Sequence, residues 1–213
     1  MTSEASEIKL IPRGAARTLL LIPGWATDYR IFASLELPYN YLVPIKFAFL
    51  DFEKRVLRAL EENALDKISI LGWSMGAYLA ADFAAKHKDR IDELILAAVR
   101  RRYKLEGLEV VRAHLERSTR GYLHSFYNEC SIPKELKNIY LEEMDRKAMM
   151  EGLDYLTTAE IVPERLKGLN VEFVHGEKDK IAPIDEVRLL AKELEGSRLT
   201  EIKDAGHFPY PLI

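Results

Sequence analysis

The pentapeptide Gly72-Trp73-Ser74-Met75-Gly76 is the segment of this chain whose residue types point most directly to chemistry. It is a G-x-S-x-G pattern, and it stands where a predicted strand turns into a predicted helix. Such a turn can hold a nucleophile in strained geometry only if the residues two positions before and after it are small, and both are glycine here. Ser74 is therefore the candidate nucleophile, and the alternative interpretation is an ordinary serine N-cap.

A serine hydroxyl needs a base, and the base needs an acceptor that orients it. Of the five histidines, three lie in predicted helices and His175 lies at the end of a predicted strand. His207 stands in a loop directly after the last predicted strand and is the predicted base. Asp179 follows a strand by a few residues and is the predicted acid, so that nucleophile, acid and base occur in the chain order of a nucleophile-elbow hydrolase. Two competitors for the acid are Glu177 and Asp204.

An acyl-transfer site also needs two backbone N–H donors aimed at the developing oxyanion. Met75, directly after the nucleophile, is the first candidate donor. The second is Trp25, which follows Gly24 in the loop after an earlier predicted strand, where glycine permits close approach of the backbone. The Trp25 indole is also a candidate wall of the acyl pocket, and the alternative is a tryptophan that only packs in the core.

The elements that must position these residues are predicted from the hydrophobic pattern. Short apolar runs are typical of strands buried on both faces, and stretches with apolar residues at helical spacing lie between them. This alternation predicts an α/β fold with a mostly parallel sheet and helices on both faces. The carboxyl ends of parallel strands share one sheet edge, so the three candidate loops converge there. The predicted strands are residues 18–22, 41–49, 67–72, 93–99, 171–176 and 198–202. Four helices are predicted outside the insertion described next: one that begins at Tyr29, one that follows an N-cap at Asp51, and two that span residues 75–86 and 183–195.

Residues 100–166 interrupt the alternation, because they contain no convincing strand. They predict helices at 105–116 and 120–129 and a third helix from about residue 133. A helical insertion between two stretches of parallel sheet is most simply a cap over the carboxyl edge. We therefore predict a single domain, residues 1–213, with a helical cap at about 100–166.

Composition excludes several other classes of protein. The 213 residues carry 31 basic and 34 acidic side chains, and this near balance argues against a nucleic-acid binder and against a disordered acidic chain. One cysteine rules out an internal disulfide, and no apolar run is long enough for a membrane helix. The polar N-terminus is unlike a signal peptide. We predict a cytoplasmic protein without a cofactor, and no Cys/His cluster has metal-binding spacing.

Four segments carry a resemblance to a known family: LIPGWATD, GWSMG, VEFVHGEKDKIAP and DAGHFPY. They resemble the family blocks of α/β hydrolases, and most of all those of the pimeloyl-acyl-carrier-protein methyl ester esterases of biotin synthesis and nearby small carboxylesterases. The resemblance runs from about residue 18 to 209 and is loose in the cap. The more specific points are the Gly24-Trp25 pair, Trp73 and residues 151–156.

The resemblance implies an α/β-hydrolase fold with Ser74, Asp179 and His207 as the triad and Trp25 and Met75 as oxyanion donors. It also implies that Phe126 to Cys130, in the cap, lie along the substrate channel. The chain departs from the family pattern in having Pro23 where a histidine is usual, and in ending six residues after His207. The second departure leaves one flank of the site less covered, so both a monomer and a homodimer are open.

The charge is unevenly distributed along the chain. Between residues 98 and 124 there are seven basic and three acidic side chains, a local balance of +4. Our hypothesis is that this part of the cap docks an acidic acyl-carrier protein through Arg101, Arg117 and Arg120, and the alternative is an ordinary solvated face. Three other functions share the same fold: a general carboxylesterase or thioesterase, a lyase or carbon–carbon hydrolase, and a non-catalytic ligand receptor.

Overall fold

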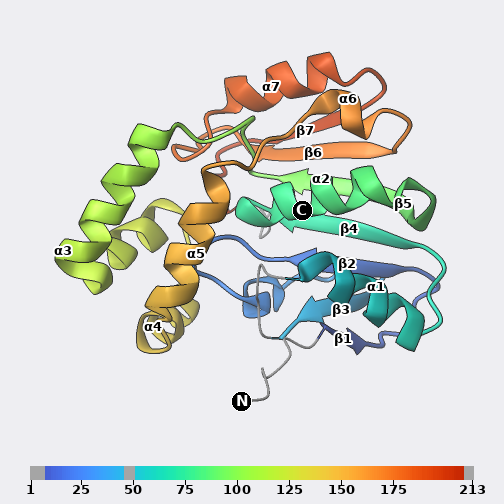
Figure 1. Ribbon diagram of the computed structural model, residues 1–213, viewed down its shortest axis with the longest axis horizontal. Helices are drawn as coiled ribbons and strands as arrows, with labels where there is room; N and C mark the ends of the chain where they lie inside the picture. The colour runs from blue at the N-terminus through green and yellow to red at the C-terminus, as the bar shows by residue number, and fades with distance from the viewer. Residues whose placement is uncertain (1–7, 46–50, 209–213) are drawn as a thin grey trace.

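The computed structural model describes residues 8–45 and 51–208. Seven strands form one sheet in the order β1-β3-β2-β4-β5-β6-β7, and all neighbouring pairs are parallel except β1 with β3. The predicted mostly parallel sheet is thus confirmed (Figure 1). The strands are β1 (Ile8–Ile11), β2 (Thr18–Ile22), β3 (Asn40–Pro44), β4 (Ile68–Trp73), β5 (Ile91–Ala97), β6 (Val171–Gly176) and β7 (Arg198–Ile202).

The central strands are the ones that the apolar runs predict best. Every residue of β2 and of β4 is buried, which is what a strand covered on both faces requires. The edge differs from the prediction. The antiparallel strand β1 was not predicted, and the prediction for residues 41–49 is fulfilled as far as Pro44, whereas residues 46–49 lie outside the described part of the chain.

Helices pack along the sheet in the order of its strands. The helix α1 (Phe52–Glu62) contacts β1, α2 (Met75–Lys86) contacts β2, β4 and β5, and α7 (Ile184–Glu193) contacts β6 and β7. Alanines at 77, 80, 81 and 84 are buried in α2, so this helix can lie close to the strands. Two predicted details differ in part. Asp51 is the N-cap residue of α1, as predicted, but it has φ of 62° and its side chain makes no capping bond. The helix predicted from Tyr29 is a short 3₁₀ helix, η1 (Tyr29–Phe32).

The cap consists of the three helices α3 (Leu105–Glu129), α4 (Lys134–Glu142) and α5 (Arg146–Leu156). Figure 1 shows them gathered beyond one end of the strands. One long helix, α3, bends at Ser118, where φ is −161° and ψ is 89°, so its two arms match the two helices predicted there. The third predicted helix is instead two, which separate before Asp145 because its carboxylate accepts a capping bond from the Ala148 N–H at 3.1 Å. The short helix α6 (Pro163–Leu166) follows the cap.

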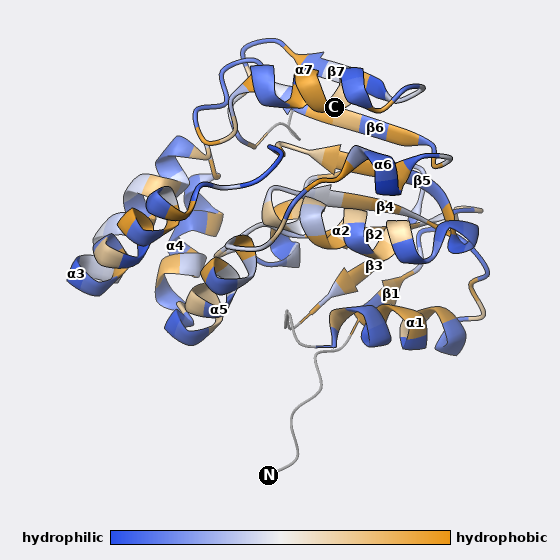
Figure 2. Cartoon of the chain, turned by 45° about the horizontal axis from the view of Figure 1, so that its top comes forward, coloured by the Kyte–Doolittle hydropathy of each residue, from blue (hydrophilic) through white to orange (hydrophobic). Residues whose placement is uncertain are grey.

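Hydropathy differs between the sheet and the cap. Figure 2 shows mostly apolar colour on the strands of the sheet, with pale stretches in β4 and a polar segment in β6, whereas the cap helices alternate between polar and apolar residues along their length. The cap helices therefore have one buried side and one exposed side, as expected of helices that cover a site. Within the described ranges, no helix is long and apolar enough to cross a membrane.

Candidate active site

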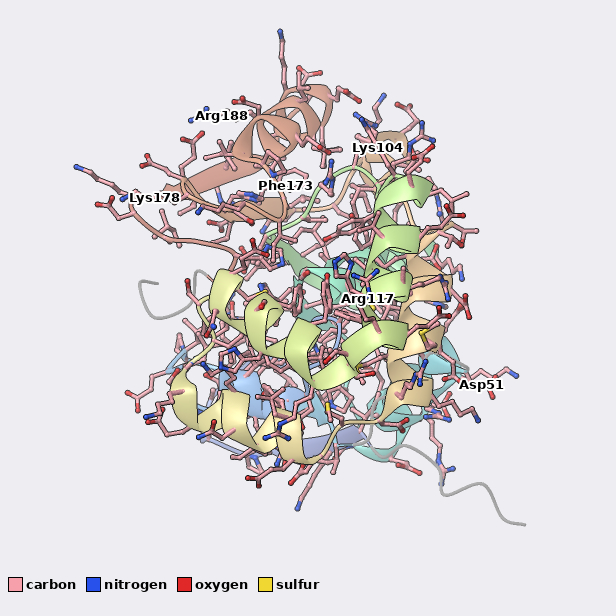
Figure 3. All side chains as sticks on the ribbon, turned by 90° about the vertical axis from the view of Figure 1, so that its left-hand side faces the viewer. Asp51, Lys104, Arg117, Phe173, Lys178 and Arg188 are labelled. Carbon is pink, nitrogen blue, oxygen red and sulfur yellow. The ribbon has the colours of Figure 1, made fainter. Side chains whose placement is uncertain are left out.

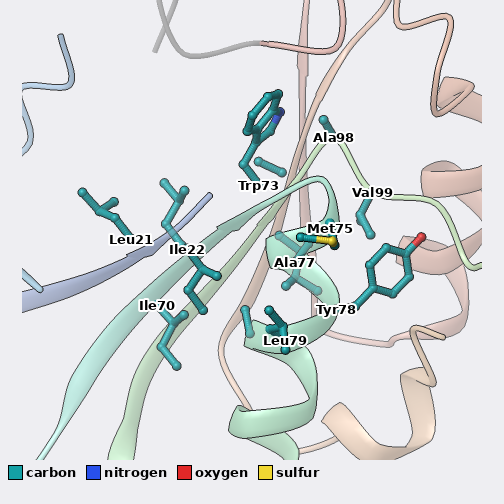
Figure 4. Packing of buried hydrophobic residues seen from close by; sticks show 14 of the residues in the cluster. Leu21, Ile22, Ile70, Trp73, Met75, Ala77, Tyr78, Leu79, Ala98 and Val99 are labelled. Carbon is teal, nitrogen blue, oxygen red and sulfur yellow. The ribbon is translucent and has the colours of Figure 1, made fainter. Parts of the chain in front are cut away.

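The turn from β4 into α2 holds Ser74 in a conformation that few side chains adopt. Its φ is 55° and its ψ is −119°, and its N–H donates to the Ala97 carbonyl at 2.8 Å. A Cβ on Gly76 would stand 2.3 Å from the Ile22 carbonyl oxygen, and one on Gly72 would stand 2.4 Å from the Gly76 oxygen. Only glycine fits at both positions, so close packing fixes the strained turn. Figure 4 shows buried hydrophobic side chains packed near it, among them Trp73, Met75 and Ala77.

Ser74, His207 and Asp179 form one chain of hydrogen bonds. The Nε2 atom of His207 lies 2.8 Å from the Ser74 Oγ, and its Nδ1 lies 2.8 Å from the Asp179 Oδ2. All three residues are buried. They come from the carboxyl ends of β4, β6 and β7, which the parallel sheet brings to one edge. The geometry is that of a nucleophile beside a base that is oriented by an acid.

Asp179 is held as a carboxylate by the groups around it. Burial alone would raise its pKa, but the hydrogen bond and charge of His207 and the backbone N–H of Ala182 together lower it. Its Oδ1 accepts hydrogen bonds from the Ile181 and Ala182 N–H groups at 2.8 and 2.9 Å. Asp179 is therefore fixed in position from both oxygens.

The competing acids lie elsewhere. Glu177 is exposed, and Asp204 forms an exposed ion pair with Lys178. The loop that carries His207 is anchored instead by its backbone, because the Trp73 Nε1 donates to the His207 carbonyl at 2.7 Å. Of the three candidate acids, only Asp179 contacts the histidine within the described residues.

The loop after β2 lies directly against the nucleophile. A Cβ on Gly24 would stand 3.2 Å from the Ser74 Cβ, so the backbone approaches the serine as closely as predicted. Within residues 8–45 and 51–208, the Trp25 and Met75 N–H groups have no hydrogen-bond acceptor. Gly24, Trp25 and Met75 also line a cavity of about 140 Å³, so the two donor segments border open space. Both N–H groups are free to bind an oxyanion.

A second cavity, of about 220 Å³, opens beside the Ser74 side chain under the cap. Phe126 lines it, as predicted, and its ring meets the Trp25 indole edge to face at 5.1 Å. Cys130 does not line it: the side chain is fully buried, and burial raises the pKa of its thiol. Most of the remaining wall is apolar, including Leu108, Val111, Leu153 and Leu156, and Glu129 is the acidic residue among those that line it.

Two residues near the site, Tyr103 and His175, were not predicted as part of it, and Tyr127, within the range Phe126 to Cys130 expected along the channel, makes a contact that was not predicted. Tyr103, in the loop after β5, shares the cavity with Ser74 and interacts with its hydroxyl, although burial raises the pKa of the phenol. His175 contacts Asp179 Oδ2 at 3.4 Å, and its Nε2 lies 2.6 Å from the Ala182 carbonyl oxygen. Tyr127 reaches from α3 to the loop after β2. For Tyr103 and His175 the available signal was their position at or after the carboxyl ends of β5 and β6.

The three arginines predicted to dock a carrier protein differ in their surroundings. Arg101 is paired with Glu193 at 2.5 Å, and Arg120 donates to the Leu141 carbonyl at 2.9 Å. Arg117 is exposed on α3, on the side of the molecule drawn in Figure 3, and Lys104 lies near the start of the same helix. Arg101 and Arg120 therefore bind other groups of the same chain, whereas Arg117 is exposed to solvent.

Histidine, cysteine, aspartate and glutamate side chains nowhere gather into a group of three or more suited to a metal ion, within the ranges that the structure describes. The arrangement at Ser74 has the parts that acyl transfer uses without one: nucleophile, base, orienting acid and two free N–H donors.

Comparison with known proteins agrees with this geometry. Residues 23–117, which include the nucleophile and the loop after β2, match the family model described as alpha/beta hydrolase fold. The chain has the α/β-hydrolase fold. The fold predicted from the resemblance is therefore confirmed. Among curated proteins, this chain is 23% identical to the AB hydrolase superfamily protein YisY of Bacillus subtilis, over 91% of this chain and 86% of that one.

Solved structures of α/β hydrolases share the fold along almost the whole chain. An esterase from Exiguobacterium antarcticum superposes with a TM-score of 0.80 at 16% identity, covering 95% of this chain and 89% of that one. An enol-lactonase from Burkholderia xenovorans superposes with a TM-score of 0.76 at 19% identity, again covering 95% and 89%. At these identities the likeness describes the architecture alone.

Proposed function

We propose that this α/β hydrolase is a serine carboxylic-ester hydrolase. The observation that carries the proposal is the hydrogen-bonded chain from Ser74 Oγ through His207 to Asp179, with both bonds at 2.8 Å. The two free N–H groups of Trp25 and Met75 beside the nucleophile support it further, because ester hydrolysis develops negative charge on the carbonyl oxygen.

The reaction proceeds through an acyl-enzyme. His207 takes the Ser74 proton as Oγ attacks the ester carbonyl, and the oxyanion accepts hydrogen bonds from the Trp25 and Met75 N–H groups. The carbon–oxygen bond to the alcohol then breaks, and His207 returns its proton to the leaving alkoxide. Water attacks the acyl-enzyme in the same way, which releases the carboxylic acid and restores the serine. Asp179 stays ionised throughout and stabilises the imidazolium.

The acyl group that the site favours is long and uncharged. Apolar side chains line most of the 220 Å³ cavity, and Glu129 would repel a free carboxylate there. A methyl ester of a carrier-bound dicarboxylic acid meets this demand, because its reacting end is neutral and its chain is made of methylene groups. Pimeloyl-acyl-carrier-protein methyl ester, the substrate of the family that the sequence most resembles, is therefore the specific substrate we propose.

A burst experiment tests the catalytic part of this proposal. Wild-type protein mixed with p-nitrophenyl acetate should release one rapid equivalent of p-nitrophenol per site, and Ser74→Ala should release none. Thr119→Ala, a change of an α3 residue that lies outside the cavity wall, serves as the matched hydroxyl control. A silent wild-type protein would contradict the proposal and favour a ligand receptor on the same fold.

The substrate part is tested by complementation. A biotin auxotroph that lacks the methyl ester esterase should grow when it expresses the wild-type chain and should not grow with Ser74→Ala. Activity toward simple esters without complementation would contradict the pimeloyl substrate and leave a general carboxylesterase or thioesterase.

A further inference from the structure

The two proposed oxyanion donors are positioned in different ways. The Met75 N–H belongs to the first turn of α2 and is fixed by that buried helix. The Trp25 N–H belongs to a four-residue turn, Gly24 to Thr27, whose internal bonds are a weak backbone contact of 3.4 Å and a Thr27 Oγ1 bond of 3.0 Å to the Gly24 carbonyl. The geometry of the second donor therefore depends on what holds this turn.

The turn contains a strained residue. Ala26 has φ of 57°, in the left-handed region where a residue with a Cβ costs about 1–2 kcal/mol. Glycine is the usual occupant of such a position in a turn, and alanine persists there only if contacts from outside enforce the conformation.

Those contacts come from the cap. The Tyr127 hydroxyl on α3 donates to the Ala26 carbonyl at 2.6 Å, and the Trp25 Nε1 donates to the Met149 carbonyl on α5 at 2.8 Å. Tyr127 is 1% exposed, so its hydroxyl bond is protected from water. The strained peptide of the oxyanion turn is thus tied to two cap helices that are distant from it in the sequence.

We propose that Tyr127 is a positioning residue for catalysis: its hydroxyl fixes the Ala26 peptide and so aims the Trp25 N–H at the oxyanion. This inference rests on the proposed function and goes beyond it, because it makes the cap part of the oxyanion-binding machinery. A cap displaced from the turn would leave Ser74 and His207 in place and withdraw one oxyanion donor.

The neighbouring Tyr140 provides a matched control. Its ring lies 5.8 Å from that of Tyr127 and is also buried, and its hydroxyl interacts with the backbone of Asp28, which lies outside the turn from Gly24 to Thr27. Removing either hydroxyl deletes one oxygen from the same aromatic cluster. Only Tyr127→Phe removes a bond to the oxyanion turn.

The test compares Tyr127→Phe with Tyr140→Phe using p-nitrophenyl butyrate. Loss of a whole oxyanion donor costs about 10²–10³ in kcat, so a misaligned donor should cost about tenfold. We expect this loss in kcat for Tyr127→Phe with KM unchanged within twofold, and both parameters within twofold of wild type for Tyr140→Phe. Affinity for butaneboronic acid, whose tetrahedral adduct occupies the oxyanion site, should fall about as much as kcat, while affinity for butyrate should not.

Equal kinetics of the two variants, or equal losses of boronate and butyrate affinity, would overturn the proposal. Failure of the proposed function is distinguished by a second readout that needs no catalysis. Amide hydrogen exchange of residues 24–27 should be faster in Tyr127→Phe than in Tyr140→Phe. If the wild-type protein is inactive but shows this difference in exchange, the esterase assignment is wrong, whereas the conclusion that Tyr127 fixes the turn stands. If exchange is the same in both variants, Tyr127 does not fix the turn.

Discussion

Asp179 is a buried carboxylate, and it can orient His207 only while its two oxygens are unprotonated and accept hydrogen bonds. One oxygen accepts from two backbone N–H groups and the other from His207, so the carboxylate fixes which ring nitrogen of the histidine carries the proton. With Nδ1 protonated toward Asp179, Nε2 is left as the acceptor for the Ser74 hydroxyl. The assignment of base and acid roles in the proposed reaction follows from this one contact.

Asp179→Asn is expected to lower kcat by about 10⁴-fold and to leave the fold intact. The amide oxygen can still accept the bonds from the Ile181 and Ala182 N–H groups, but the amide nitrogen would face His207 and force the wrong tautomer. Steady-state kinetics with a methyl ester, together with the melting temperature, checks this. Asp204→Asn, which alters an exposed ion pair, should retain wild-type kcat, and a similar loss in both variants would contradict the assigned role.

His175 predicts how stability depends on pH. Burial lowers its pKa in the folded protein, so between pH 6.5 and that lowered value the unfolded chain binds a proton that the folded chain does not. The contribution of neutral His175 to the free energy of unfolding should therefore be complete above about pH 6.5. It should fall as the pH falls below that value, by at most about 1.4 kcal/mol per pH unit. Urea denaturation of His175→Gln should show a shallower dependence of the free energy of unfolding on pH between pH 7.5 and 5.5 than wild type, and an equal slope in the two proteins would contradict this role of His175.

Asp179 affects stability in a second, more acidic pH range. Its lowered folded pKa contributes stability that is present above the unfolded value of about 3.9 and is lost as the pH falls through the folded value. The two groups therefore act in separate pH ranges. A single transition near pH 6 that accounted for all acid destabilisation would contradict this account of Asp179.

At the scale of the elements, the packing of α2 on the sheet depends on the absence of side chains at the elbow. A Cβ on Gly76 would stand 2.3 Å from the Ile22 oxygen and 2.5 Å from the Pro23 oxygen, and both are backbone atoms that cannot turn aside. Gly76→Ala should therefore lower the free energy of unfolding by at least about 1–3 kcal/mol, measured by urea denaturation.

Gly107→Ala is the matched control for that prediction. Gly107 lies inside α3, and a Cβ there would meet nothing within 4 Å. Because alanine is the better helix former, this variant should be more stable than wild type by up to about 1 kcal/mol. Equal destabilisation of the two variants would show that the close approach at Gly76 is not what limits the packing.

The elements differ in how far the sequence predicts them. The strands β2 and β4 are mostly apolar because both of their faces are buried, so they can be recognised without tertiary information. The strand β1 is only four residues long with alternate residues exposed, and its pairing with β3 is a tertiary contact without a local signal. The break between α4 and α5 depends on the Asp145 cap, which apolar spacing alone does not reveal.

The site divides in the same way. Ser74, Asp179 and His207 follow strands at the sheet edge, so residue type and position suffice to find them. The contacts of Tyr127 with Ala26 and of Trp25 with Met149 join residues more than a hundred positions apart, and they arise only when the cap docks. Cap residues were for this reason the least predictable part, and Cys130 proved to be buried away from the cavity wall.

For the whole molecule, the folded structure redistributes the charge of the cap. The balance of +4 between residues 98 and 124 is partly neutralised by Glu186, Glu193 and Asp154, which pair with three of its arginines and lie outside that segment. With those three carboxylates counted, the balance is +1. A carrier protein would therefore meet a weaker field than the sequence suggests, centred on side chains that stay unpaired.

This sharpens the docking proposal to Lys104 and Arg117. Reversing both to glutamate should lower kcat/KM for a carrier-bound methyl ester about tenfold at low salt, and the loss should shrink as ionic strength rises. The free methyl ester should react as in wild type. Unchanged turnover and salt dependence with the carrier-bound ester would contradict docking at this surface and leave these residues as a solvated face.

The two tryptophans of the chain provide a consequence of a different kind. One indole donates its N–H to the cap at Met149, and the other donates to the carbonyl of His207, so each is tied to a different part of the site. Each is therefore an intrinsic fluorophore for one half of the site. In Trp73→Phe the remaining emission comes from Trp25 and reports movement of the cap, and in Trp25→Phe it comes from Trp73 and reports the histidine loop, so the order in which the two halves close around a ligand becomes measurable without any attached dye.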